Sequence, residues 1–120
     1  MRRIRSFGSA VSIWLDRDSA IGELRSAAAR LKDTCTEVKE VWLVGSLARG
    51  HHTGISDADV LLVLRESRLN HVERLRRYIP FFDSGLGVDI LPFTEAELDL
   101  LKKRGTGHTR SLLEGSVRVA

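Results

Sequence analysis

The chain has 120 residues, 42% of them hydrophobic, which suits one folded domain and excludes a disordered tail. No apolar run approaches the roughly 20 residues that span a bilayer, and the single cysteine, Cys35, excludes an intramolecular disulfide. The net charge of +3 is electrostatically favourable for an anionic ligand such as a nucleotide, but alone it does not indicate nucleic-acid binding. We expect one cytoplasmic domain over residues 1–120, with a flexible basic N-terminus over residues 1–8.

The first half of the chain predicts a helix followed by two strands. Apolar residues recur at helical spacing over 21–38, and a good N-cap precedes them at positions 18–19. The apolar run 41–44 ends at a glycine and predicts a buried strand, and a second strand is predicted over 57–64. The apolar segment 10–15 is too short to decide between strand and helix.

The second half predicts further helices and a third strand. A helix is expected over 69–78, ended by Pro80, and a strand over 88–91, ended by Pro92. The run Thr94-Glu95-Ala96-Glu97 has the form of a capping box and predicts another helix. A short helix over 108–113 and an edge strand over 117–119 complete the chain. The pattern predicts an α+β fold, with a small mixed β-sheet and helices packed on one of its faces.

Two aspartates begin the second predicted strand. Asp57 and Asp59 are two residues apart, so both side chains project from one face of the strand. Two ionised carboxylates this close favour a cation between them, and such hard oxygen ligands suit Mg²⁺ or Mn²⁺. If the strand over 88–91 pairs alongside, Asp89 points to the same face and completes a set of three carboxylates.

A glycine-serine turn precedes these aspartates. Gly45 lets a phosphate approach the backbone, and Ser46 adds a hydroxyl at the start of a predicted helical turn. The pattern is not a P-loop, because His51-His52 stands where lysine and serine or threonine are required. Without further histidine or cysteine nearby, the two histidines are interpreted as loop residues rather than zinc ligands.

These segments together resemble the minimal nucleotidyltransferase (MNT) domains of the DNA polymerase beta-like superfamily, of the antitoxin type. The resemblance covers about residues 41–92 and rests on three motifs: Gly45-Ser46-Leu47-Ala48-Arg49-Gly50, Ser56-Asp57-Ala58-Asp59-Val60 and Val88-Asp89-Ile90. It implies the polymerase beta-like nucleotidyltransferase fold. It also implies that Asp57, Asp59 and Asp89 are the catalytic metal ligands, and that Gly45 and Ser46 bind the nucleotide.

The resemblance implies transfer of AMP from ATP to an acceptor hydroxyl, with Mg²⁺ or Mn²⁺, two ions in all, as cofactor. Arg49 is a candidate phosphate ligand. The expected acceptor is a partner protein with a HEPN domain, which MNT antitoxins often accompany, and homo-oligomers stay possible. Neither a membrane nor nucleic acid is the expected partner.

Two alternatives remain open. The domain could be a non-catalytic module that binds a nucleotide and a partner, or a nucleotidyltransferase for small molecules of the antibiotic-modifying type. Enzymes of the latter type usually carry a further domain for the acceptor, and 120 residues leave no room for one. The sequence therefore predicts a donor site whose acceptor site is supplied from elsewhere.

Overall fold

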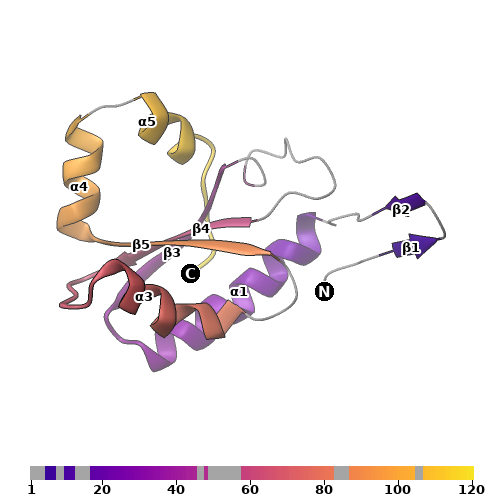
Figure 1. The fold of residues 1–120 in the computed structure, drawn as a ribbon, viewed down its shortest axis with the longest axis horizontal. Helices are drawn as coiled ribbons and strands as arrows, with labels where there is room; N and C mark the ends of the chain where they lie inside the picture. The colour runs from indigo at the N-terminus through magenta and orange to yellow at the C-terminus, as the bar shows by residue number, and fades with distance from the viewer. Residues whose placement is uncertain are drawn as a thin grey trace.

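The computed structural model of the chain describes residues 5–7, 10–12, 17–45, 48, 58–82, 87–104 and 107–120. Its centre is a four-stranded mixed sheet with the strand order β5-β4-β3-β6 (Figure 1). The strands are β3 (Val38–Val44), β4 (Ala58–Leu64), β5 (Val88–Thr94) and β6 (Val117–Arg118). β4 is parallel to β5, and β3 is antiparallel to both β4 and β6. The predicted α+β class with a small mixed sheet is confirmed.

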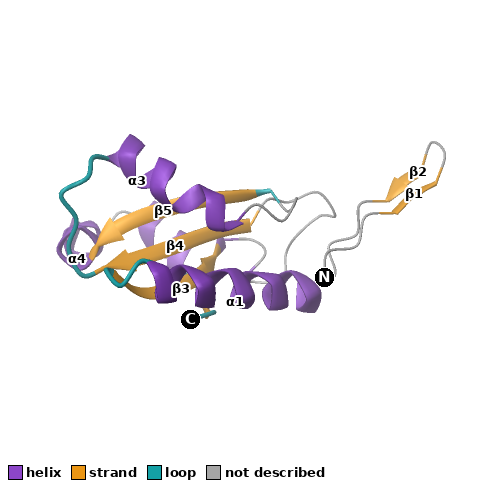
Figure 2. Cartoon of the chain, turned by 90° about the horizontal axis from the view of Figure 1, so that it is seen from below, coloured by secondary structure: helices purple, strands orange, loops and turns teal. Residues whose placement is uncertain are grey.

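Helices lie on both sides of this sheet. Figure 1 shows α1 (Arg17–Thr34) and α3 (His71–Tyr78) below the sheet, and Figure 2 looks onto these two helices. The 3₁₀ helix η1 (Ile79–Phe82) continues α3 on that side. The helices α4 (Glu95–Arg104) and α5 (Gly107–Leu113) lie on the other side. The prediction of helices on one face describes α1 and α3, and α4 and α5 add a smaller cover on the opposite face.

Side chains alternate along the strands and divide the core in two. The face of the sheet under α1 and α3, here called the first face, carries the larger cluster, which includes Val41, Leu43, Val60, Leu62, Leu64 and Ile90. The opposite face, here called the second face, carries a smaller cluster of Val44, Leu61, Val63 and Leu98, with Leu98 contributed by α4. Burial of these apolar side chains is the main stabilising contribution to the fold.

β3 begins earlier than the sequence predicts. The spacing of three residues from Cys35 to Val38 continues the helical pattern, yet α1 ends at Thr34 and Val38 is the first residue of the strand. The Val38 amide donates to the Cys35 carbonyl at 2.9 Å, which closes a turn, and Val38 then pairs with Leu64 of β4. The side chains of Cys35 and Val38 are buried in the same cluster, so the hydrophobic pattern fits either a helix or a strand at Val38.

β5 and α3 also differ from the prediction at their ends. β5 passes through Pro92 to Thr94, three residues beyond the expected end. An edge strand tolerates proline, because the missing N–H is not needed by a second neighbour. α3 starts at His71 because Asn70 and Glu73 form a capping box there, and Pro80 lies in η1 after the helix has ended.

The N-terminal segment forms a hairpin that was not expected. β1 (Arg5–Phe7) pairs antiparallel with β2 (Ala10–Ser12), and Figures 1 and 2 show the hairpin standing apart from the four-stranded sheet. This resolves the undecided segment 10–15 as strand for residues 10–12. Among the helices in the described ranges, none has the length and apolar character needed to cross a membrane.

Candidate functional site

Two aspartates face each other across the parallel pair of strands. Asp59 of β4 and Asp89 of β5 are register partners, so their side chains leave the same face of the sheet from neighbouring strands, which lie about 4.8 Å apart. That face is the second face, because Leu61 follows Asp59 by two residues and belongs to its cluster. The strand pairing on which the sequence prediction for Asp89 depends is therefore present.

Gly45 lies at the same end of the sheet as the two aspartates. It directly follows β3, whose last residue, Val44, pairs with Asp59. Gly45 has a φ of 77°, and a Cβ atom added there would lie 2.5 Å from Oδ2 of Asp59. Both the left-handed backbone and the approaching carboxylate require glycine at this position. The backbone at Gly45 and the Asp59 carboxylate are thus in direct contact.

Several predicted site residues lie outside the described residues: Ser46, Arg49, His51, His52 and Asp57. Of the predicted set, the structure brings together Gly45, Asp59 and Asp89. Among the described residues no group of three or more His, Cys, Asp or Glu side chains is placed to hold a metal ion, and the predicted third ligand, Asp57, is not among them.

The two carboxylates can hold a hard cation. Asp89 is exposed and Asp59 is half-buried, so both are reachable by a ligand at this end of the sheet. Adjacent ionised carboxylates repel each other unless a positive charge lies between them. Because carboxylate oxygens are the ligands that Mg²⁺ and Mn²⁺ prefer, the pair fits such an ion.

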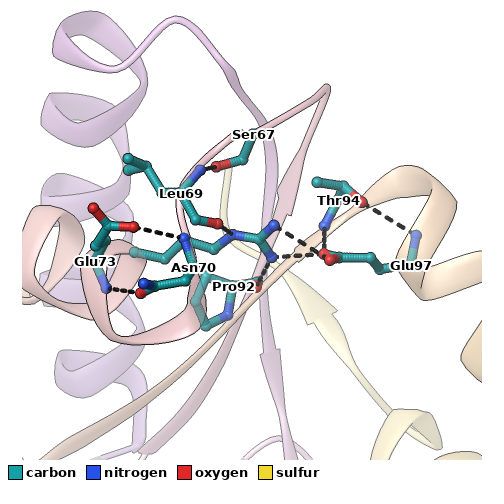
Figure 3. A network of polar contacts seen from close by, with 8 residues as sticks. Ser67, Leu69, Asn70, Glu73, Pro92, Thr94 and Glu97 are labelled. Carbon is teal, nitrogen blue, oxygen red and sulfur yellow. Dashed lines mark hydrogen bonds and ion pairs between the residues drawn. The ribbon is translucent and has the colours of Figure 1, made fainter.

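A buried arginine fixes the strand that carries Asp89. Arg74 is 7% exposed, and its guanidinium donates to both carboxylate oxygens of Glu97, at 2.6 and 3.2 Å, and to the Pro92 carbonyl at 3.1 Å. Figure 3 shows these partners, with Thr94 and Glu97 closing the predicted capping box of α4. The hydrogen bond from Arg74 lowers the pKa of Glu97 to about 2. The network ties α3, β5 and α4 together.

A second network joins α3 to the turn before β3. Glu37 accepts hydrogen bonds from Nε of Arg77 at 2.7 Å and from the hydroxyl of Tyr78 at 2.6 Å. Burial raises the pKa of Glu37, but the bonds from Arg77 and Tyr78 outweigh it and lower the value to about 2. Burial, together with the bond to Glu37, raises the pKa of Tyr78 far above its usual range. Sequence reasoning missed both networks, because their members are distant along the chain.

The comparisons with known proteins concern the family of the chain and its fold. The family model described as nucleotidyltransferase domain matches residues 22–112. A candidate nucleotidyltransferase from Sulfolobus solfataricus has a similar structure, with a TM-score of 0.66, 21% identity, and coverage of 94% of this chain and 90% of that one. A toxin-antitoxin crystallised with AMP-PNP also matches, with a TM-score of 0.52, 16% identity, and coverage of 88% and 73%. No curated protein matches the chain.

Proposed function

We propose that this chain, which belongs to the nucleotidyltransferase domain family, transfers AMP from ATP to a hydroxyl of a partner protein. The observation that carries the proposal is the register pair Asp59 and Asp89, with Gly45 against the Asp59 carboxylate. Two carboxylates and a glycine turn at one end of a sheet provide, side by side, a cation site and an approach for phosphate.

Asp59 and Asp89, with Asp57 as a third ligand, hold Mg²⁺ or Mn²⁺ in this proposal. When bound, the ions offset the negative charge of the triphosphate and of the transition state. Gly45 and Ser46 position the phosphates, and Arg49 is proposed as a further phosphate ligand. Of the two described carboxylates, Asp89 is exposed and stands on the edge strand, so it is better placed than Asp59 to meet the acceptor.

The proposed reaction is an in-line substitution at the α-phosphorus of ATP. The acceptor oxygen forms a bond to that phosphorus while the bond to the bridging oxygen of the β-phosphate breaks, and pyrophosphate leaves with the electron pair. The hydroxyl proton passes to the Asp89 carboxylate. Charge and atoms balance without any further reactant.

We place the domain as the antitoxin of a toxin-antitoxin pair whose partner has a HEPN domain. The fold likeness to a toxin-antitoxin crystallised with AMP-PNP supports this role. A non-catalytic module that binds nucleotide and partner is the second candidate, favoured by the same structural likeness.

Mass spectrometry of the partner protein tests the proposal. After co-expression with this chain, the partner is expected to carry the added mass of AMP. Asp59→Asn should reduce the modification by more than about 100-fold, because replacing even a residue that only hydrogen-bonds to a metal ligand typically lowers metal affinity or activity about 10–100-fold. Asp33→Asn, which makes the same change at an exposed position in the last turn of α1, should leave the modification unchanged.

The outcome also separates the two candidates. An unmodified partner that is nevertheless recovered in a stable complex would reject transfer and favour the binding module. Full modification by the Asp59→Asn variant would remove Asp59 from the mechanism.

A further inference from the structure

The second face continues beyond the carboxylate pair as rows of cross-strand neighbours. Starting from the carboxylate end, the rows are Val44–Asp59–Asp89, Trp42–Leu61–Leu91 and Glu40–Val63–Phe93. Successive rows are two residues, or about 7 Å, apart along each strand. The second row therefore lies within a side-chain length of the proposed nucleotide site.

A cavity of about 330 Å³ lies over the second and third rows, next to α4 and α5. Its apolar lining includes Trp42, Leu61 and Val63 from the sheet and Leu98 from α4. A volume of this size is at the small end of the range of about 300–1,000 Å³ for ligand pockets. It suits one or two side chains of a partner better than a large ligand.

Acidic side chains predominate at the polar edge of this cavity. Of the described residues that line it, Glu40, Glu95 and Asp99 are acidic and Lys102 is basic. Glu95 is bridged to Lys39 at 3.0 Å, which offsets the charge of this carboxylate, so the acidic character of the cavity depends on Glu40 and Asp99. Within the described ranges, neither Glu40 nor Asp99 forms an ion pair with lysine or arginine. The cavity is therefore acidic although the chain is basic overall.

Trp42 and Glu40 form an ordered element of the cavity wall. The indole Nε1 of Trp42 donates to Oε1 of Glu40 at 2.7 Å, which orients the ring and holds the carboxylate at its edge. An aromatic ring attracts a cation over its face, and a neighbouring carboxylate strengthens the attraction with a charge-assisted hydrogen bond. Ring and carboxylate together are suited to a guanidinium or an ammonium group.

We infer that this cavity is an acceptor-side pocket, which receives an arginine or lysine side chain of the acceptor polypeptide. The apolar stem of that side chain packs against Leu61 and Leu98, and its cationic end meets Glu40 and Asp99. The modified hydroxyl then lies a few residues away on the same polypeptide, over the first row. That the bound side chain belongs to the acceptor rests on the proposed function, whereas the binding of a cationic side chain does not.

Binding can be tested without nucleotide by nuclear magnetic resonance. The probe is an acetylated and amidated glycine-arginine-glycine peptide, and the signal is the indole N–H of Trp42, assigned with Trp42→Phe. We expect a saturable shift of this signal. The matching citrulline peptide, which lacks the charge, should bind at least about tenfold more weakly. Glu40→Gln combined with Asp99→Asn should weaken arginine binding similarly, and Asp33→Asn should not.

The inference is overturned if the arginine peptide leaves the Trp42 signal unmoved, or if the citrulline peptide binds equally well. The citrulline comparison uses the unaltered protein, so it is decisive even if the double variant folds poorly. Because ATP is absent, a failure of AMP transfer leaves this result unaffected, and a failure of peptide binding leaves the proposed transfer untouched.

Discussion

The contact between Gly45 and Asp59 limits which residue can follow the end of β3. A φ of 77° is unfavourable for any residue with a Cβ atom, and the added Cβ would lie 2.5 Å from the carboxylate oxygen. The carboxylate or the turn must therefore shift when the glycine is replaced. Asp59 can keep its position beside Gly45 only because residue 45 has no Cβ atom.

Gly45→Ala is expected to lower the free energy of unfolding by about 1–3 kcal/mol, the cost of backbone strain at such a position. Urea denaturation measures the change. Gly22→Ala is the matched control, because Gly22 lies in α1 and a Cβ there meets nothing within 4 Å. This variant should gain about 0.5–1 kcal/mol from the lower entropy of its unfolded chain. Equal effects at both positions would contradict the structure around Gly45.

At the scale of the elements, β5 is held by contacts beyond its own strand pairing. It is an edge strand that contains a proline, and it is held on its outer side by Arg74 from α3, which also binds Glu97 of α4. Removing one partner of a nearly buried arginine leaves its charge without compensation. The ion pair therefore stabilises the strand that positions Asp89.

Glu97→Gln should lower the free energy of unfolding near neutral pH by about 1–2 kcal/mol, a value reduced because the Glu97 side chain is 43% exposed. The folded-state pKa of about 2 lies below the ordinary 4.5, so the contribution of Glu97 is complete above pH 4.5. It is lost as the pH falls from 4.5 toward 2. The difference between wild type and variant should shrink over that window.

Urea denaturation at several pH values measures this difference. Glu95→Gln provides the control, since the pair of Glu95 with Lys39 is solvent-exposed and is expected to contribute less than about 1 kcal/mol. A loss in Glu97→Gln that is no greater than in Glu95→Gln would show that the Arg74 network does not stabilise β5.

For the whole molecule, the sequence predicted the fold class and most elements, because hydrophobic period, capping and turn residues are local signals. The capping box at Thr94–Glu97 and the edge strand near Val117 are confirmed. Element ends were less predictable. The spacing at Val38 fits helix and strand alike, and the proline in β5 is tolerated only because of the strand's place in the sheet.

The candidate site was predictable in part for the same reason. Alternation along a strand places Asp59 on a definite face, but only the parallel register with β5 brings Asp89 beside it. Contacts between distant segments leave no local signal in the sequence. Examples are the hydrogen bond between Glu37 and Tyr78, and the cavity that Trp42 of β3 lines together with Leu98 of α4. The roles of Ser46 and Asp57 remain predictions.

The central claim is that Asp59 and Asp89 form a metal-dependent nucleotide site beside Gly45. Isothermal titration calorimetry with ATP, in the presence and absence of Mg²⁺, tests it most directly. We predict saturable binding with Mg²⁺ that is lost when the ion is removed and in Asp89→Asn, while Asp33→Asn binds normally. ATP binding that is indifferent to both Mg²⁺ and Asp89→Asn, or no binding with Mg²⁺ present, would contradict the account.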